Sequence, residues 1–155
     1  MDRTDMRLRV ASAKDSAALA LLAENAHNHA WSESQYQQSF SAGHYCWVME
    51  QSKNIIACCV TSKLLDEAEI LDIAVSPAWR RRGLAEALLE NLIATLPAEI
   101  ARLLLEVRVS NLAARSLYRK LGFSEDGMRK NYYPALDGRR EDAVLMSLAL
   151  NGAQS

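Results

Sequence analysis

The sequence predicts an α+β fold: a single three-layer domain in which a mixed, mostly antiparallel sheet is flanked by helices. Two observations support this prediction. Strand-like and helix-like segments follow one another in the order β-α-α-β-β-β-α-β-α-β-β, and no internal repeat or low-complexity linker interrupts them. A chain of 155 residues, half of them hydrophobic, also has the size of one domain with a real core. We therefore expect one domain over residues 1–155, with residues 150–155 as a disordered tail.

The first half of the chain is expected to contain one strand, two capped helices and three further strands. Both helices begin at a serine that is followed three residues later by a side chain able to return the cap hydrogen bond. The expected elements are a strand over 8–11, a helix capped by Ser12 with Asp15 and continued by 17–26, a helix from Ser32 with Gln35 that ends before Gly43, and strands over 45–50, 55–64 and 69–75. The turn 51–54 predicts a hairpin.

The second half is expected to contain two helices and three strands. Its clearest signal is an apolar stripe with three- to four-residue spacing, which predicts a helix that begins at Gly83 and ends at Pro97. The stripe consists of Leu84, Leu88, Leu89, Leu92, Ile93 and Leu96. The later elements are expected to be a buried strand over 103–109, a helix capped by Asn111 and stopped by Gly122, and strands over 123–133 and 143–148 around a turn at Asp137-Gly138, with 139–142 in the turn.

Charge and hydropathy argue against several classes of function. The formal net charge of −1 provides no global basic field for direct binding to nucleic acid. The apolar runs, such as 55–60, are far shorter than a membrane span, and no signal peptide is visible. We therefore expect a cytoplasmic protein without a membrane partner. The sequence does not show the oligomeric state, for which a monomer is the default expectation.

Thiol and imidazole groups give no sign of a metal site. Cys46, Cys58 and Cys59 lack metal or redox spacing and are expected to be reduced core thiols. His27 and His29 are two residues apart, so a helix would place them on different faces. No metal is expected.

The main functional signal is the turn Arg80-Arg81-Arg82-Gly83-Leu84-Ala85, which lies between an apolar strand and the leucine-striped helix. A helix N-terminus presents unpaired backbone N–H groups and partial positive charge, and therefore suits a phosphate. Gly83 would let an anion approach the backbone closely. The phosphate-loop pattern of nucleotide triphosphatases is absent. Three arginines alone would indicate a solvated basic face, but the strand before them and the helix after them favour a phosphate site.

In this setting the chain resembles the GCN5-related N-acetyltransferase superfamily, whose signature is Gln/Arg-x-x-Gly-x-Gly/Ala. Arg80, Gly83 and Ala85 occupy the three specified positions, and Ala85 is the less common choice at the last one. The resemblance implies acetyl-CoA as co-substrate. Its pyrophosphate would lie on the backbone of the turn and of Glu86, with Asn111 as a further cofactor contact.

The same resemblance implies that the backbone of Ile73, Ala74 and Val75 holds the pantetheine arm like an added strand. An N–H there would polarise the thioester carbonyl.

Further segments resemble the bacterial ribosomal-protein-alanine N-acetyltransferases over nearly the whole chain. They are Trp31-Ser32-Glu33, Leu65-Asp66-Glu67-Ala68, Ile73-Ala74-Val75, Leu105-Glu106-Val107-Arg108, Ser110-Asn111, Leu117-Tyr118, Leu121-Gly122-Phe123 and Arg129-Lys130-Asn131-Tyr132-Tyr133-Pro134. Ala30 stands where that family has a proline. The resemblance implies transfer of an acetyl group to the N-terminal alanine of the eighteenth small-subunit ribosomal protein.

Two residues carry the expected catalysis. Glu106 interrupts an apolar strand, where a carboxylate is costly unless it is paired or faces a cleft. The resemblance makes it the general base, acting through water; the alternative is a salt bridge to Arg108 or another arginine. Tyr118 would protonate the departing coenzyme A thiolate by resemblance, whereas a packing role is the alternative.

The basic N-terminal tail of the ribosomal protein is the expected partner. Asp66 and Glu67, with Glu69 near them, could attract it, although an ordinary charged turn explains them nearly as well. Tyr132 and Tyr133 are candidates to line the peptide entry, with Trp31 nearby; the alternative is that two of these three aromatics simply cover the sheet.

Two other functions compete. An enzyme of the same fold could acetylate lysine side chains, polyamines or another small amine; a lysine amine, with its higher pKa, needs a stronger base. A protein of a different class would be a non-catalytic acetyl-CoA-binding module. The presence of both Glu106 and Tyr118 argues against that class.

Overall fold

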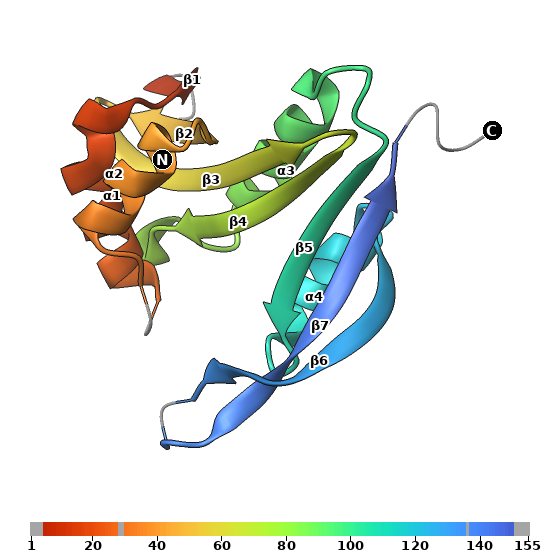
Figure 1. Cartoon of the computed structure of the whole chain (residues 1–155). Helices are drawn as coiled ribbons and strands as arrows, with labels where there is room; N and C mark the ends of the chain where they lie inside the picture. The colour runs from red at the N-terminus through yellow and green to blue at the C-terminus, as the bar shows by residue number, and fades with distance from the viewer. Residues whose placement is uncertain (1–4, 28–29, 136, 151–155) are drawn as a thin grey trace. The chain divides into compact units, whose positions relative to one another are not determined.

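The computed structural model describes residues 5–27, 30–135 and 137–150, and its elements follow the predicted order (Figure 1). They are β1 (Met6–Val10), a 3-10 turn η2 (Ala13–Asp15), α1 (Ser16–Ala26), α2 (Glu33–Ser41), β2 (Tyr45–Gln51), β3 (Asn54–Leu64), β4 (Glu67–Val75), a 3-10 turn η3 (Pro77–Trp79), α3 (Leu84–Thr95), β5 (Arg102–Arg108), α4 (Leu112–Lys120), β6 (Ser124–Pro134) and β7 (Arg140–Ala149).

The strands form a sheet of order β1-β2-β3-β4-β5-β7-β6. The β4–β5 pair is parallel, whereas β1–β2, β2–β3, β5–β7 and β6–β7 are antiparallel. The predicted α+β fold with a mixed, mostly antiparallel sheet is therefore confirmed. Packing divides the chain into two compact units, Met1–Ser62 with Leu71–Leu96 and Lys63–Ile70 with Pro97–Ser155, so β4 contributes to both.

The predicted helix-start signals work as expected. The Ser12 N–H donates to Asp15 Oδ2 at 2.9 Å, and this contact precedes α1. Ser32 and Gln35 bond reciprocally at 2.8 and 3.2 Å at the start of α2. In α4 the Asn111 Oδ1 accepts from the Ala114 N–H at 3.2 Å. Short-range caps thus set the helix starts in both units.

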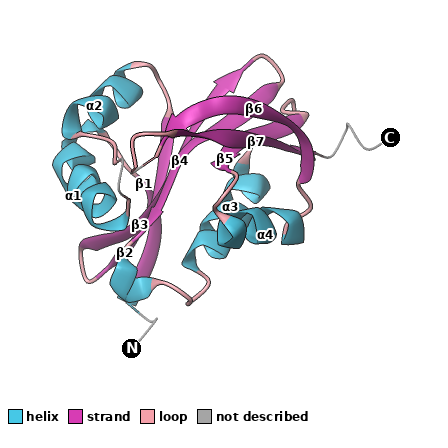
Figure 2. Cartoon of the chain, turned by 90° about the horizontal axis from the view of Figure 1, so that it is seen from below, coloured by secondary structure: helices cyan, strands magenta, loops and turns pink. Residues whose placement is uncertain are grey.

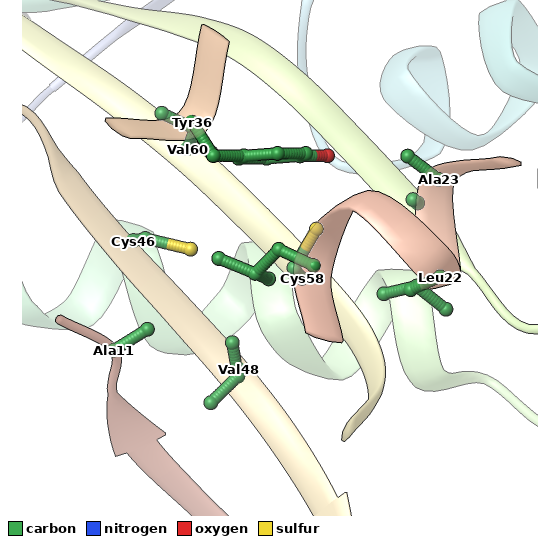
Figure 3. Close-up of a cluster of buried hydrophobic side chains, with 10 residues drawn as sticks. Ala11, Leu22, Ala23, Tyr36, Cys46, Val48, Cys58 and Val60 are labelled. Atoms are coloured by element: carbon green, nitrogen blue, oxygen red, sulfur yellow. The ribbon is translucent and has the colours of Figure 1, made fainter. Parts of the chain in front are cut away.

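The core of the first unit lies between α1, α2 and the inner strands β2 and β3 (Figures 2 and 3). Figure 3 shows Tyr36, Cys46, Val48 and Cys58 gathered there, and each is at most 1% exposed. Cys59 is also fully buried, on the next residue of β3, and all three thiols are free. The prediction of reduced core thiols agrees with this arrangement.

A buried carboxyl forms one edge of that core. The Tyr36 hydroxyl donates to Asp72 Oδ2 at 2.6 Å, and the Cys58 thiol lies 4.0 Å from the same oxygen. Burial raises the pKa of Asp72, while the Tyr36 hydrogen bond and the charge of His27 partly oppose the rise. In the sequence, Asp72 is simply one residue of the predicted strand over 69–75.

In the second unit, β5 alternates between two environments. Leu103, Leu105 and Val107 are buried, whereas Glu106 and its neighbours Leu104 and Arg108 are half-buried. Helix α4 lies against one face of β5-β7-β6 in both views (Figures 1 and 2). Because strand side chains alternate, the apolar set faces this side and Glu106 faces the other.

The structure corrects two boundaries at the end of the chain. Residues Arg140, Glu141 and Asp142 belong to β7 and not to a turn. Arg140 and Glu141 pair with β6, the Glu141 carboxylate also accepts from the Ser110 N–H, and Asp142 Oδ1 accepts from the Asn131 N–H. Leu150 is 7% exposed and its N–H donates to the Ala101 carbonyl at 2.8 Å, so it is packed and not part of a tail. Residues 151–155, the rest of the expected tail, lie outside the described residues.

We predict that Asp72→Asn stabilises the protein at neutral pH by about 1 kcal/mol. The folded-state pKa of Asp72 is raised, so the folded protein holds this proton more tightly than the unfolded chain does. Its contribution is therefore favourable at low pH and is lost as the pH rises above the ordinary aspartate range. Urea unfolding from pH 3 to pH 8 should show a gain for the variant that grows with pH.

The Asp126→Asn substitution is the control, because Asp126 is an exposed residue of β6. It should leave the pH dependence of the unfolding free energy unchanged. A loss of stability in Asp72→Asn at pH 7 would mean that the ionised carboxylate is required by Tyr36.

Candidate active site

The predicted phosphate turn has the backbone geometry of an anion site. Arg81 and Gly83 both adopt left-handed conformations, with φ of 63° and 76°. Gly83 is the N-cap of α3 and has no side chain with which to cap it, so the first N–H groups of the helix point out of its end. Left-handed residues in such turns form concave arrays of N–H groups that bind anions. A phosphate group fits this turn.

A Cβ at Gly83 would meet no atom within 4 Å. The space above the backbone is therefore open, and the glycine is required by its positive φ and not by crowding.

The arginine side chains of the turn have different roles. Arg80 Nη2 donates to the Ala26 carbonyl at the end of α1, at 2.8 Å. The Arg82 guanidinium lies 5.0 Å from the centroid of the Trp79 ring. Leu84 is 3% exposed, so its side chain is packed and is not available to a ligand. Arg80 therefore braces the turn against α1, a role that its sequence pattern did not indicate.

The end of α1 also reaches the predicted pantetheine strand. His27 Nε2 lies 3.0 Å from the Ile73 carbonyl, to which its N–H tautomer donates. Ala74 is buried, and its neighbour Val75 ends β4. His29, the other histidine considered for a metal, lies outside the described residues. Residues Ala26 and His27 thus hold both parts of the predicted cofactor site in the first unit.

The register of the β4–β5 pair covers the first part of β4. It joins Glu67–Ile70 to Arg102–Leu105, and Leu71–Val75 continue the strand beyond this register. A strand edge with unused N–H and C=O groups can accept an added extended chain. This stretch includes the three residues predicted to bind pantetheine, of which Ile73 already accepts a hydrogen bond from His27 at its carbonyl.

In the second unit, Glu106 is paired with an arginine, but not with Arg108. Arg129 Nη2 lies 3.1 Å from Glu106 Oε1, and the two side chains are 51% and 17% exposed. Arg108 instead contacts Glu141 at 3.0 Å and the Pro134 carbonyl at 2.7 Å. The salt-bridge alternative for Glu106 is therefore realised, with Arg129 as the partner.

Glu69 shares this charged environment. Burial raises its pKa, the negative charge of Glu106 raises it further, and Arg129 opposes the rise. The register places Glu69 opposite Leu104, two residues before Glu106 on the adjacent strand, so all three face the same side of the sheet. The two carboxyl groups therefore interact.

Two tyrosines complete the cluster. The Tyr132 and Tyr133 rings meet edge to face with centroids 5.0 Å apart. Arg129 lies over Tyr132 and Arg108 over Tyr133, each at 4.6 Å. Burial and then the charge of Glu106 raise the pKa of Tyr133 to about 12. The charge of Glu106 is the main cause of the raised pKa of Tyr132.

Tyr118 occupies a different environment from Glu106. It is 5% exposed on α4, and its ring centroid is 5.7 Å from that of Phe123. Asn111 caps the same helix, as predicted. The packing alternative for Tyr118 is thus realised, while its role as an acid stays a prediction.

The remaining predicted substrate residues have structural contacts. The Trp31 ring lies 5.1 Å from that of Tyr36. Glu67 forms an ion pair with Arg102 at 3.0 Å, and the Asp66 carbonyl accepts from the Ala101 N–H at 2.6 Å. These contacts fit the charged-turn alternative for Asp66 and Glu67.

Four residues with contacts in or beside the predicted site were not predicted from the sequence: His27, Asp72, Arg129 and Glu141. No local pattern marks them, since each contacts a residue far away in the sequence. Within the described ranges, no group of histidine, cysteine, aspartate or glutamate residues could hold a metal ion. No helix in the part described is long and apolar enough to cross a membrane.

Several known proteins are similar to this chain in sequence and in fold. The acetyltransferase (GNAT) family model matches residues 15–123. Ribosomal protein bS18-alanine N-acetyltransferase of Escherichia coli K12 is 41% identical over 138 residues, which are 88% of this chain and 93% of that protein.

Two solved structures are also similar. The crystal structure of the ribosomal-protein-S18-alanine N-acetyltransferase from Escherichia coli superposes with a TM-score of 0.89 and 39% identity over 94% of each chain. An acetyltransferase from Salmonella typhimurium, solved with its cofactor acetyl-CoA, has a TM-score of 0.76 and 20% identity over 96% of this chain and 95% of that one. The present chain belongs to the acetyltransferase (GNAT) family.

Proposed function

We propose that this enzyme transfers the acetyl group of acetyl-CoA to the N-terminal alanine amine of ribosomal protein bS18. The observation that carries the proposal is its 41% identity, across nearly the full length of both chains, to an enzyme named for this reaction. Such a reaction on a ribosomal protein fits the cytoplasm. The substrate is the protein tail, so no direct contact with nucleic acid is required.

Acetyl-CoA is the expected co-substrate, and the first unit has features suited to it. The left-handed turn at Arg81 and Gly83, with the N–H groups of Leu84, Ala85 and Glu86 behind it, would hold the pyrophosphate. The edge of Ile73, Ala74 and Val75 would hold the pantetheine arm. Arg82 would add charge, and Asn111 would be a further contact besides its role as a cap.

Glu106 is proposed to take the proton from the substrate amine, through water. An N-terminal amine has a pKa near 8, so a modest base is sufficient. The nitrogen lone pair then attacks the thioester carbonyl, the C–S bond breaks, and the nitrogen releases its second proton to solvent, from which Tyr118 recovers the one it donates; the products are an N-acetyl amide and coenzyme A. Tyr118 would supply the proton that the departing thiolate takes up.

The substrate tail is proposed to bind beside Glu106 in the second unit. Tyr132 and Tyr133 offer flat surfaces for a peptide, and Asp66, Glu67 and Glu69 offer negative charge for a basic tail. Trp31 is a further candidate for the peptide entry. A monomer would be sufficient for this chemistry.

The reaction can be tested with a basic peptide that begins Ala-Arg and contains an internal lysine. Mass spectrometry should find one acetyl group, on the α-amine. Glu106→Gln should reduce kcat/KM about 100-fold, because the amide cannot accept the proton.

Glu125→Gln is the matched control, because Glu125 is also ion-paired, to Arg115 at 2.9 Å, in the same unit. It should retain wild-type kcat/KM. Acetylation of the lysine alone would leave the family and co-substrate in place but contradict the N-terminal assignment.

Tyr118→Phe should lower kcat about 100-fold while the KM for acetyl-CoA changes little, because only the acid is removed. Steady-state assays with the same peptide would measure kcat and the KM for acetyl-CoA. Tyr45→Phe, on an exposed residue, is the control. An unchanged kcat would assign Tyr118 to packing against Phe123.

Gly83→Ala should raise the KM for acetyl-CoA about 10-fold, since the left-handed backbone that forms the phosphate site becomes strained. Gly138→Ala is the matched control: its φ of 83° is similar, and a Cβ there also meets nothing within 4 Å. Both variants should lose about 1 kcal/mol of stability. Equal KM values in the two variants would show that the turn does not bind the co-substrate.

A further inference from the structure

The ion pair between Arg129 and Glu106 spans an intervening strand. In the sheet register Glu106 lies opposite Leu145 of β7, whereas Arg129 lies opposite Ala143, its neighbour on the same face. The guanidinium therefore reaches diagonally across β7 to the carboxylate, on the face of the sheet opposite α4. The 3.1 Å contact is half open to solvent on the arginine side.

Arg129 differs from Arg108 in how it is held. Arg108 lies over the Tyr133 ring, but its guanidinium is fixed by Glu141 and by the Pro134 carbonyl, both outside the proposed peptide-binding groups. Within the described residues, Arg129 is held by Glu106 and by the face of Tyr132. Both of these groups belong to the proposed peptide site, so the arginine occupies that site itself.

The substrate is also a cation. At neutral pH most α-amino groups are protonated, because their pKa is near 8. This ammonium must come within one water of Glu106 if Glu106 is to receive its proton. A carboxylate beside one cation attracts a second cation less, because the first has neutralised most of its field. Arg129 and the substrate ammonium therefore compete for Glu106.

We propose that Arg129 is a resident counter-ion of Glu106, which the cationic N-terminus of the substrate displaces and which returns once acetylation has made that terminus neutral. This role rests on the proposed function of Glu106. Arg129 is thereby a specificity-determining residue. An unmodified terminus can replace it, whereas the acetylated product has no charge with which to do so.

Glu69 gives the exchange a second carboxylate. It faces the same side of the sheet as Glu106, and its titration responds to both Glu106 and Arg129. Glu69 is therefore a second carboxyl group on the face from which Arg129 approaches Glu106. The displaced guanidinium can therefore stay near Glu69 and Tyr132 without entering bulk water.

The alternative is a permanent structural ion pair that fastens β6 to the sheet. A half-exposed pair of this kind contributes little to stability, in general about 0–1 kcal/mol. The two roles differ in kinetics: a structural pair has no reason to oppose peptide binding, whereas a counter-ion does.

The test compares Arg129→Gln with Arg119→Gln in the full-length enzyme. Arg119 is a matched control, because it is also 51% exposed and also lies 3.1 Å from a glutamate, Glu125. With the Ala-Arg peptide, Arg129→Gln should lower the peptide KM about 3- to 10-fold, with kcat and the KM for acetyl-CoA within about twofold of wild type. Inhibition by the N-acetylated peptide should tighten by a similar factor. Arg119→Gln should change none of these.

An unchanged or higher peptide KM in Arg129→Gln would overturn the counter-ion role. Failure of the wild type to acetylate an α-amine would instead contradict the proposed function. Should Arg129→Gln fold poorly, NMR of the 15N-labelled wild type keeps the test open. The Arg129 side-chain signal should shift on addition of a peptide with an N-terminal trimethylammonium group and stay in place with the N-acetylated peptide. Equal responses to both peptides would also overturn the proposal.

Discussion

The short pairing between β4 and β5 is the constraint on which two features depend: the charged cluster around Glu106, and the course of the strand predicted to hold pantetheine. It covers Glu67–Ile70 and Arg102–Leu105. Within this register Glu69 is held on the same face as Glu106, so two carboxylates are brought together. Beyond it, Leu71–Val75 continue as a strand whose inner residues Leu71 and Ala74 pack in the first unit's core. The register with β5 ends before this segment.

The two-residue period of β5 explains how the second unit tolerates its acidic groups. The apolar residues Leu103, Leu105 and Val107 provide the burial that holds the strand in place. The alternate face is therefore free to carry Glu106 without a charge entering the core. Arg129 of β6 then compensates Glu106 by an ion pair and packs on the Tyr132 ring, and such contacts are adaptable in a way that a packed core is not.

The elements were predictable because their signals are local. The caps at Ser12, Ser32 and Asn111 bond to groups three residues away, and these hydrogen bonds are present in the structure. Glu106 could also be recognised as a candidate from local sequence, because its immediate neighbours in the strand are apolar. The start of β7 was missed because Arg140 and Glu141 look like turn residues, and their pairing depends on the opposite strand.

The partners within the site were not predictable in the same way. The register between β6 and β7 shifts twice, so counting residues from the turn cannot bring Arg129 to Glu106. Tyr36 and Asp72 meet only because α2 packs over β3 and β4, and no spacing in the sequence encodes that contact. The functions of Tyr118, Asn111 and the phosphate turn remain predictions of the family resemblance.

The burial of the three cysteines has a consequence for an enzyme that releases coenzyme A. Each turnover frees a thiol that can enter mixed disulfides with accessible protein thiolates when an oxidant is present. Burial raises the pKa of Cys59 to about 12, and the pKa of Cys58 is raised by its hydrogen bond to Cys46 and by burial. Both thiols therefore stay protonated, and Cys46 is equally enclosed at 1% exposure. The folded enzyme is thus chemically inert towards its own sulfur-bearing product, and its thiols become reactive only when the core opens.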